Sequence, residues 1–100
     1  MTVRYEVTLD VPAERAEAIE RYMRERHIPD ILATGCFRSV RLERASETRV
    51  RTSYEAATRM DFERYLKEHA ERFRTHFWEH VGQGVVPLRE LWEEVATYHP

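Results

Sequence analysis

Three histidines recur on one face of a predicted helix, and two of them have the spacing of metal ligands. His76 and His80 are four residues apart, which places both imidazoles on the same side of a helix. His69 lies roughly 10 Å from His76 along the axis, at about 1.5 Å per residue, and no HExxH motif accompanies the three. We therefore predict no metal site and no cofactor, and interpret these rings as lying at the edge of the core.

A second group of chemically versatile residues is the segment HIPDILATGCF, residues 27–37. It holds the only thiol, Cys36, and an imidazole, His27, which are a candidate nucleophile and base. Cys36 falls on the apolar side of a predicted strand, where cysteine is usually an inert small hydrophobe, and no glycine loop follows it. Pro29 can begin a short helical turn, and Gly35 can end it in a left-handed conformation. We therefore interpret the segment first as a connector between a helix and a strand.

The third candidate site is a pocket between a sheet and the helices that cover it. An arginine, phenols and imidazoles in such a pocket can bind an anionic or aromatic ligand, or relay protons near neutral pH. The candidate ligand-binding residues are Tyr5, His27, Arg38, Tyr54, His69 and His76. Arg38 is the most informative, because an arginine on an apolar face must find a carboxylate, reach the rim or bind a ligand. Pairing with Asp30 or with a glutamate at the sheet's edge is the competing interpretation.

The strands that would position these side chains follow from alternation of apolar and polar residues. Such alternation covers residues 2–10, 36–44 and 49–56, and period two with one apolar side is typical of a half-buried strand. The last two segments flank a short polar turn, so we predict that they form a hairpin. In this pattern Arg38 shares the apolar face of its strand, and Phe37 points to the opposite side.

Two helices are predicted between the strands. The first runs from about residue 12 to 26 and closes before Pro29, because the residue preceding a proline is biased away from the helical region. The second runs over residues 59–80, where apolar and histidine residues recur at steps of three and four. Thr58 and Asp61 have the spacing of a capping box at its start. The sequence GQG then ends it.

The closing segment, VVPLRELWEEV at residues 85–95, suits a strand or a helix equally well by its apolar pattern. A strand is preferred, because a helix here would leave the sheet with an open edge. The order strand, helix, strand, strand, helix, strand predicts a single α+β domain over residues 1–100. Its fold would be a ferredoxin-like βαββαβ sandwich, with a four-stranded antiparallel sheet and both helices on one face.

The face of the sheet away from the helices is predicted to carry most of the strand charges. Its members are Arg4, Glu6, Phe37, Ser39, Arg41, Glu43, Arg49, Arg51, Ser53 and Glu55. This face is either solvated, which antiparallel sheets tolerate, or a dimer interface between two facing sheets. Opposite charges on neighbouring strands add only about 0.2–1 kcal/mol per pair. An interface would therefore need apolar anchors, such as Phe37 and the fourth strand.

Composition excludes several classes of partner. The formal net charge is −2, and the basic residues are interleaved with glutamates, so we predict no binding to nucleic acid. No run approaches the roughly 20 apolar residues that span a bilayer, and no basic amphipathic helix favours a membrane surface. A single cysteine allows no intrachain disulfide. With no apolar stretch of a signal peptide at the start, we expect a cytoplasmic protein.

Three stretches carry a family resemblance: HIPDILATGCFRSVRL, YLKEHAERFRTHF and VVPLRELWEEV. Together they resemble a bacterial domain-of-unknown-function family within the dimeric α/β-barrel superfamily, whose members begin with a similar strand and carry an HIPDVLATG segment. The residues at matching motif positions are His27, Pro29, Asp30, Gly35, His69 and His76. His80 does not belong to the pattern. The resemblance implies a ferredoxin-like homodimer that pairs sheet to sheet, and implies no activity.

Two functions therefore stay open. The first is a small homodimeric protein that binds a small molecule between sheet and helices, at most a cofactor-independent oxygenase or isomerase by analogy of fold. The second is a non-catalytic dimerisation or interaction module, in which the same residues are structural. A cavity with unpaired polar groups would favour the first function, and a filled core the second.

Overall fold

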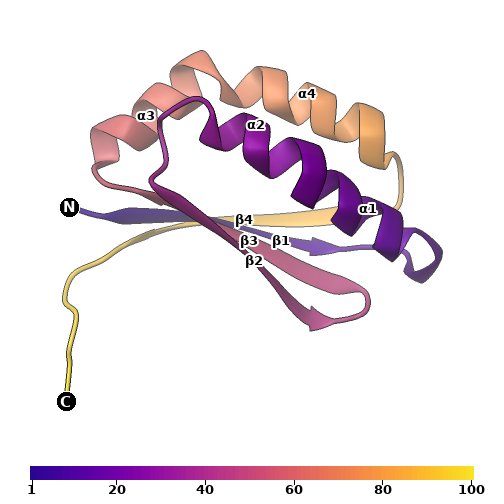
Figure 1. Cartoon of the computed structure of the whole chain (residues 1–100), viewed down its shortest axis with the longest axis horizontal. Coiled ribbons are helices and arrows are strands. Elements are labelled where there is room, and N and C mark those ends of the chain that lie inside the picture. The colour runs from indigo at the N-terminus through magenta and orange to yellow at the C-terminus, as the bar shows by residue number, and fades with distance from the viewer.

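Helices cover one face of a four-stranded antiparallel sheet, and the opposite face is open (Figure 1). This arrangement is seen in a computed structural model, which describes residues 1–100. The strands lie in the order β2-β3-β1-β4, and the predicted α+β, ferredoxin-like sandwich is confirmed. The strand bounds are Val3–Asp10 for β1, Ser39–Ser46 for β2, Arg49–Ala56 for β3 and Val86–Glu93 for β4.

The central strand β1 pairs with β3 on one side and with β4 on the other along its full length. Directly opposed residues share a face of the sheet, so Tyr5 points toward the helices together with its two partners, Tyr54 and Leu91. The preferred interpretation of the closing segment as a strand is confirmed. This strand satisfies the backbone groups of β1 that would otherwise form a sheet edge. The Glu94 amide still donates to the Thr2 carbonyl at 2.9 Å, and residues 95–100 then leave the sheet (Figure 1).

The first helical region is continuous, contrary to the prediction that it closes before Pro29. It consists of a 3-10 turn η1 (Ala13–Arg15), α1 (Ala16–Tyr22), a π-helical turn η2 (Met23–His27) and α2 (Ile28–Leu32). In η2 the Ile28 amide donates to the Met23 carbonyl, five residues back. Because Pro29 has no amide hydrogen and its ring crowds the preceding turn, a regular α-helix would be disrupted here. The wider π turn accommodates the proline without breaking the helix.

The second predicted helix is divided at His69, whose φ is −130°. The two parts are α3 (Arg59–Glu68) and α4 (Ala70–Val81). The predicted cap of α3 is confirmed, since Thr58 Oγ1 accepts a hydrogen bond from the Asp61 amide at 3.2 Å. The prediction of one unbroken helix over residues 59–80 is therefore wrong.

The buried face of α4 also differs from the predicted stripe. Phe73, Phe77 and Val81 are buried, whereas His76 is half-buried and His80 is exposed. Apolar side chains gain most from burial, so the phenyl and isopropyl groups take the core positions and the imidazoles lie beside them. No helix of the protein is long and apolar enough to span a bilayer.

The segment before β2 corrects the predicted second strand. Residues 36–38 are not part of the strand, which begins at Ser39, and the alternation of faces does not apply to them. Cys36 and Phe37 are both buried. The Phe37 ring lies 5.3 Å from the Tyr54 ring in the core, so Phe37 is not an anchor on the open face.

Candidate functional site

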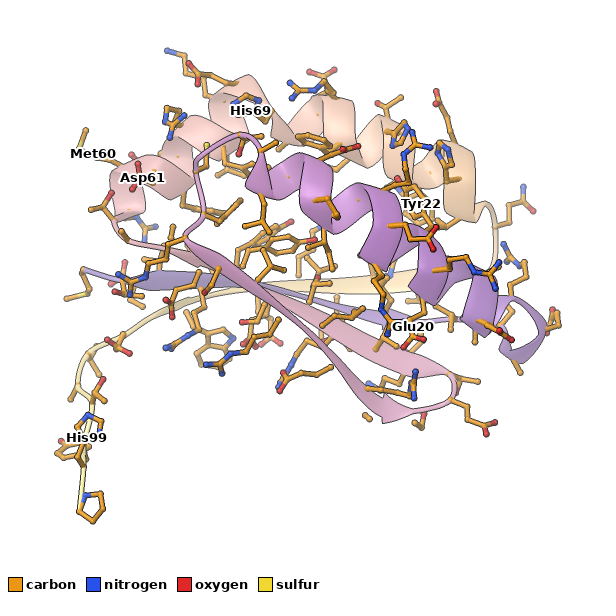
Figure 2. The ribbon with its side chains drawn as sticks, in the orientation of Figure 1. Glu20, Tyr22, Met60, Asp61, His69 and His99 are labelled. Carbon is orange, nitrogen blue, oxygen red and sulfur yellow. The ribbon has the colours of Figure 1, made fainter.

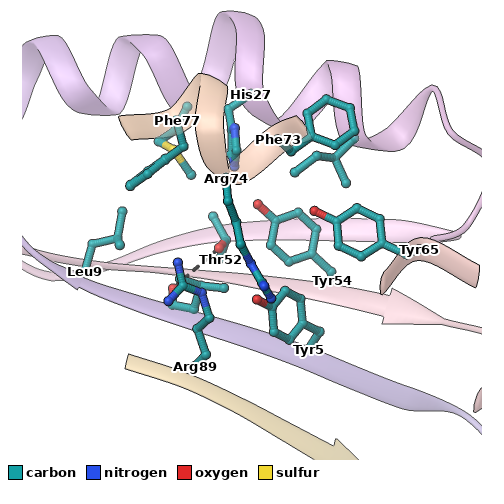
Figure 3. Close-up of a pocket in the computed structure, with 13 residues that line it drawn as sticks. Tyr5, Leu9, His27, Thr52, Tyr54, Tyr65, Phe73, Arg74, Phe77 and Arg89 are labelled. Carbon is teal, nitrogen blue, oxygen red and sulfur yellow. Dashed lines mark hydrogen bonds between the residues drawn. The ribbon is translucent and has the colours of Figure 1, made fainter. Parts of the chain in front are cut away.

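A small cavity lies between the helix-covered face of the sheet and the helices (Figure 3). Its volume is about 40 Å³, which is room for a few water molecules. Strands β1, β3 and β4 supply its floor, and η2, α2, α3 and α4 supply its roof. The residues that line it are Tyr5, Val7, Leu9, Met23, His27, Ile31, Thr52, Tyr54, Tyr65, Phe73, Arg74, Phe77 and Arg89.

Three tyrosines form one wall of the cavity. Tyr5 comes from β1, Tyr54 from β3 and Tyr65 from α3, and ring centroids of Tyr5 and Tyr54 are 5.9 Å apart. Burial raises the pKa of Tyr54 and Tyr65 well above the ordinary value for a phenol. Both hydroxyls therefore stay protonated and can each donate and accept a hydrogen bond.

His27 reaches the cavity from the end of the π turn η2. Its ring is buried, with 8% of the residue exposed. Burial, with a smaller contribution from the nearby His76, lowers the pKa of His27 to about 4. At neutral pH the imidazole is uncharged, so one ring nitrogen is a donor and the other an acceptor. Its Nδ1 lies 3.4 Å from the Tyr22 hydroxyl oxygen, and Nε2 has no hydrogen-bond partner in the protein.

Two arginines stand at the open side of the cavity. Figure 3 shows the Arg74 side chain descending from α4 toward Tyr5, and Arg89 rising from β4 beside Thr52. Most arginines of this chain form ion pairs with carboxylates, but no carboxylate lies within 4.0 Å of either of these guanidinium groups. The mouth of the cavity is therefore positively charged and lacks an internal counterion.

Three of the predicted binding residues, Tyr5, His27 and Tyr54, line the cavity together. Arg38 does not. Its Nε donates to Glu55 at 2.6 Å, and its side chain is 51% exposed. The prediction that Arg38 points toward the helices is wrong, because Arg38 precedes β2 and its strand alternation. Its pairing with a glutamate at the sheet's edge is the competing interpretation stated above.

The other two predicted residues, His69 and His76, lie on the far side of the helices. They line an open outer hollow of about 670 Å³ between α2 and the α3–α4 pair. Figure 2 shows His69 at the junction of α3 and α4, away from the sheet. The predicted set is thus divided between an inner cavity and an outer hollow. The other residues of the hollow are Asp30, Leu66, Lys67, Glu68, Glu71, Arg72, Phe73, Thr75 and Glu79.

A cluster of rings separates the two spaces. The Tyr22 hydroxyl oxygen lies 2.9 Å from His76 Nδ1. The Tyr22 ring stacks on His80 with centroids 4.7 Å apart, and the centroids of His76 and His80 are 4.2 Å apart. Burial raises the pKa of Tyr22 to about 12. No three His, Cys, Asp or Glu side chains of the protein are grouped as metal ligands.

The candidate pair of Cys36 and His27 is not brought together. Cys36 is a free, buried cysteine in the core, and its backbone amide donates to Thr34 Oγ1 at 3.2 Å. No hydrogen bond joins its sulfur to the His27 ring. The segment 27–37 is thus part connector and part site, since only His27 reaches the cavity.

Among the residues that the predicted lining lacked are Tyr65, Arg74 and Arg89 of the cavity and Tyr22 of the ring cluster. Tyr22 belongs to the apolar stripe of the first helix, and its phenol gave no separate signal. Arg74 follows the buried Phe73, and its position depends on the break at His69. The position of Arg89 could have been predicted from the strand interpretation of residues 85–95, since Arg89 is opposite Val7 on the helix-covered face.

Comparison with known proteins places the chain in a family. The model of a domain of unknown function, DUF4286, matches residues 2–95. This chain belongs to the DUF4286 family. The family model matches this range as a whole and does not single out any one segment. The HIPDVLATG-type motif therefore stays a prediction as a family signature. No curated protein matches the DUF4286 chain.

Solved structures show the same fold at low sequence identity. A dimeric ferredoxin-like protein from an uncultured marine organism superposes with a TM-score of 0.72 at 16% identity, covering 97% of this DUF4286 chain and 98% of that protein. An ethyl tert-butyl ether (EthD) family protein from Bacillus halodurans gives 0.76 at 13% identity, covering 95% and 100%. A variant of SnoaB, a cofactor-independent oxygenase from Streptomyces nogalater, gives 0.68 at 14% identity, covering 96% and 95%.

Proposed function

We propose that this DUF4286 protein is a homodimer that binds a small anionic molecule with a flat apolar part, seated between the sheet and the helices. The observation that carries the proposal is the pair Arg74 and Arg89 at the mouth of the cavity, with no carboxylate partner. Guanidinium groups recognise carboxylates and phenolates through charge-assisted hydrogen bonds. The aromatic wall behind them suits a flat apolar group.

The polar groups inside the cavity support the same ligand class. The phenols of Tyr5, Tyr54 and Tyr65 and the neutral imidazole of His27 can orient a bound molecule without adding charge. A few convergent polar groups in an otherwise apolar pocket are typical of a small-molecule site.

The volume of about 40 Å³ admits only water while both arginines cover the mouth. Their side chains are exposed and hold no ion pair, so they can swing outward without losing one. A ligand that binds their guanidinium groups would widen the mouth as it enters. We therefore propose a site that opens on binding.

The open back of the sheet supports the homodimer. Along β4 the side chains of Val86, Leu88 and Trp92 are 63%, 52% and 54% exposed, and all three lie opposite back-facing residues of β1. These exposed apolar side chains, between which only Glu90 interrupts the line, favour contact with another protein surface. A two-fold interface uses the same surface on both copies. The dimeric ferredoxin-like neighbour supports this assembly by analogy of fold.

The second candidate function is a dimerisation module without a ligand, favoured by the small size of the cavity. Under that function, the arginines at the mouth are solvated surface charges. A bacterial, cytoplasmic location belongs to the proposal as well, and the single free cysteine, Cys36, is consistent with a reducing compartment.

Calorimetric titration of the full chain with benzoate and with its uncharged analogue benzamide tests the ligand class. We expect benzoate to bind at least about tenfold more tightly, since a hydrogen bond to a charged group contributes about 1.5–3 kcal/mol. The double variant Arg74→Gln, Arg89→Gln should lose this preference. The matched control is Arg26→Gln, which removes another exposed arginine with no ion pair that lines neither the cavity nor the hollow.

Two results would favour the dimerisation module instead: no binding of benzoate by the wild-type protein, or equal binding by the double variant and the control. Circular dichroism of each variant checks that the fold is retained.

A further inference from the structure

One tyrosine connects the inner cavity to the outer hollow. His27 lines the cavity, and His76 lines the hollow on the other side of the helices. Tyr22 on α1 contacts both, with its hydroxyl oxygen 3.4 Å from His27 Nδ1 and 2.9 Å from His76 Nδ1. Figure 2 shows Tyr22 on the helical layer above the sheet. The three side chains therefore form a continuous row between two spaces that the helices separate.

The single proton of the phenol fixes the direction of these hydrogen bonds. Tyr22 has one proton to donate, and the shorter contact makes His76 Nδ1 its acceptor. The hydroxyl oxygen then accepts from His27, so His27 carries its proton on Nδ1 and leaves Nε2 bare. Every fully buried side-chain nitrogen and oxygen has a hydrogen-bond partner. Nε2 of His27, which has none, is therefore not fully buried, and His27 lines the cavity.

We propose that His27, Tyr22 and His76 relay protons between a molecule bound in the cavity and the outer hollow. The bound molecule gives a proton to His27 Nε2, and His27 passes its Nδ1 proton to the Tyr22 oxygen. Tyr22 passes its own proton to His76 Nδ1, and His76 releases its Nε2 proton to water in the hollow. One proton leaves the cavity and one reaches solvent, with no change of oxidation state. The inference deepens the proposed function by giving the site a general base.

The charges around the row are arranged to support this direction. Asp30 and Glu79 line the outer hollow together with His76, so carboxylates stand at the end of the row where the proton is released. The cavity end has Arg74 and Arg89 instead, which favour the deprotonated form of a bound ligand. Arg26 also acts on Tyr22, and His80 stacks on the Tyr22 ring from the solvent side.

The relay is reversible, because the passage of one proton along the whole row exchanges the tautomers of both imidazoles. After one proton has left, His27 carries its proton on Nε2 and His76 carries its proton on Nδ1. A proton that enters at His76 Nε2 runs the three transfers backward and returns a proton to the cavity. The row can therefore remove a proton from a bound molecule and later restore it.

Nuclear magnetic resonance of the ligand-free protein tests the relay independently of ligand binding. Long-range ¹H–¹⁵N correlations assign the tautomers, and we expect Nδ1–H for His27 and Nε2–H for neutral His76. Exchange of the His27 Nδ1 proton with water should slow at least tenfold in Tyr22→Phe. The control is Tyr98→Phe, which removes an exposed phenol of the C-terminal tail, outside both the cavity and the hollow, and should leave this exchange unchanged.

Chemical rescue gives a second measurement that a structural role would not affect. His76→Ala should slow the same exchange, and imidazole added to the solution should restore it, because imidazole can occupy the vacated place beside Tyr22. Imidazole should restore nothing in Tyr22→Phe. An Nε2–H tautomer for His27, or equal exchange rates in wild type, Tyr22→Phe and His76→Ala, would overturn the relay and leave the ligand proposal unaffected.

Discussion

On the open back of the sheet the arginines pair with carboxylates, except for Arg41, whereas at the edge of the helix-covered face both arginines of the cavity mouth lack one. Arg51 contacts Glu43 at 2.8 Å, and Arg4 contacts Glu55 at 3.2 Å, each across neighbouring strands. Such pairs are satisfied within one chain, so they give no sign of a ligand. The back instead presents exposed apolar side chains on β4, which favour contact with another protein.

The helix-covered face differs because its polar groups are buried or turned toward a cavity. His27 is uncharged there, and the guanidinium groups at the mouth have no internal counterion. The proposed ligand site therefore rests on unpaired charge next to a cavity and not on the number of charges on a face. Three experiments separate the contributions of the two faces.

The largest expected effect concerns burial of His27 and is a loss of stability in mild acid. The pKa of His27 is about 4 in the folded protein, against about 6.5 in an unfolded chain. The unfolded state therefore binds a proton that the folded state excludes, and stability present above pH 6.5 is lost as the pH falls toward 4. The total loss should be on the order of 3 kcal/mol.

Urea unfolding at constant protein concentration between pH 7 and pH 4 measures this loss. His27→Gln should flatten the dependence, and His99→Gln, which changes an exposed histidine of the tail, should leave it as in wild type. If the wild-type stability were constant over this range, His27 could be charged inside the fold. The difference between the two faces would then not depend on an uncharged His27.

The next effect concerns the apolar line on the back of the sheet. Leu88→Glu places a carboxylate in the proposed interface, and we expect the dimer dissociation constant to rise at least about 30-fold, as for a hot-spot residue of about 2 kcal/mol. Sedimentation equilibrium measures it. The matched control is Leu66→Glu, since Leu66 is 42% exposed on the helical side. A wild-type particle of 12.0 kDa at all concentrations would refute the homodimer.

The smallest effect is expected at Arg38, which stands between the two faces. Its ion pair with Glu55 is largely solvated, so Arg38→Met should cost less than about 1 kcal/mol in urea unfolding. Benzoate binding should be unchanged, because Arg38 lies outside the cavity. If Arg38→Met lost benzoate binding but kept its fold, Arg38 would belong to the site, and the site would lie closer to the sheet's edge than proposed.

Much of the architecture was predictable because alternation and helical spacing report burial directly. β3 covers the residues predicted for it, and the ambiguous closing segment became a strand because β1 needed a partner on its second side. Local rules failed where tertiary packing overrode them. The rule for residues before a proline predicted an end to the helix at Ile28, and the π turn passed that position instead.

The candidate site was predictable only in part, for a related reason. Tyr5 and Tyr54 lie in regular strands, so their direction followed from the alternation. Arg38 lies just outside a strand, where the alternation does not hold. Arg74 was missed because its position depends on the break at His69, and no local signal in the sequence marks that break.

The π turn η2 has a geometric consequence for the whole helical layer. A regular α-helix advances by about 100° per residue, so a turn that holds one residue more rotates everything after it by about that angle. His27 closes this wider turn. The count of residues between Tyr22 and Pro29, rather than any single side chain, thus sets whether the imidazole faces the sheet or the surrounding water.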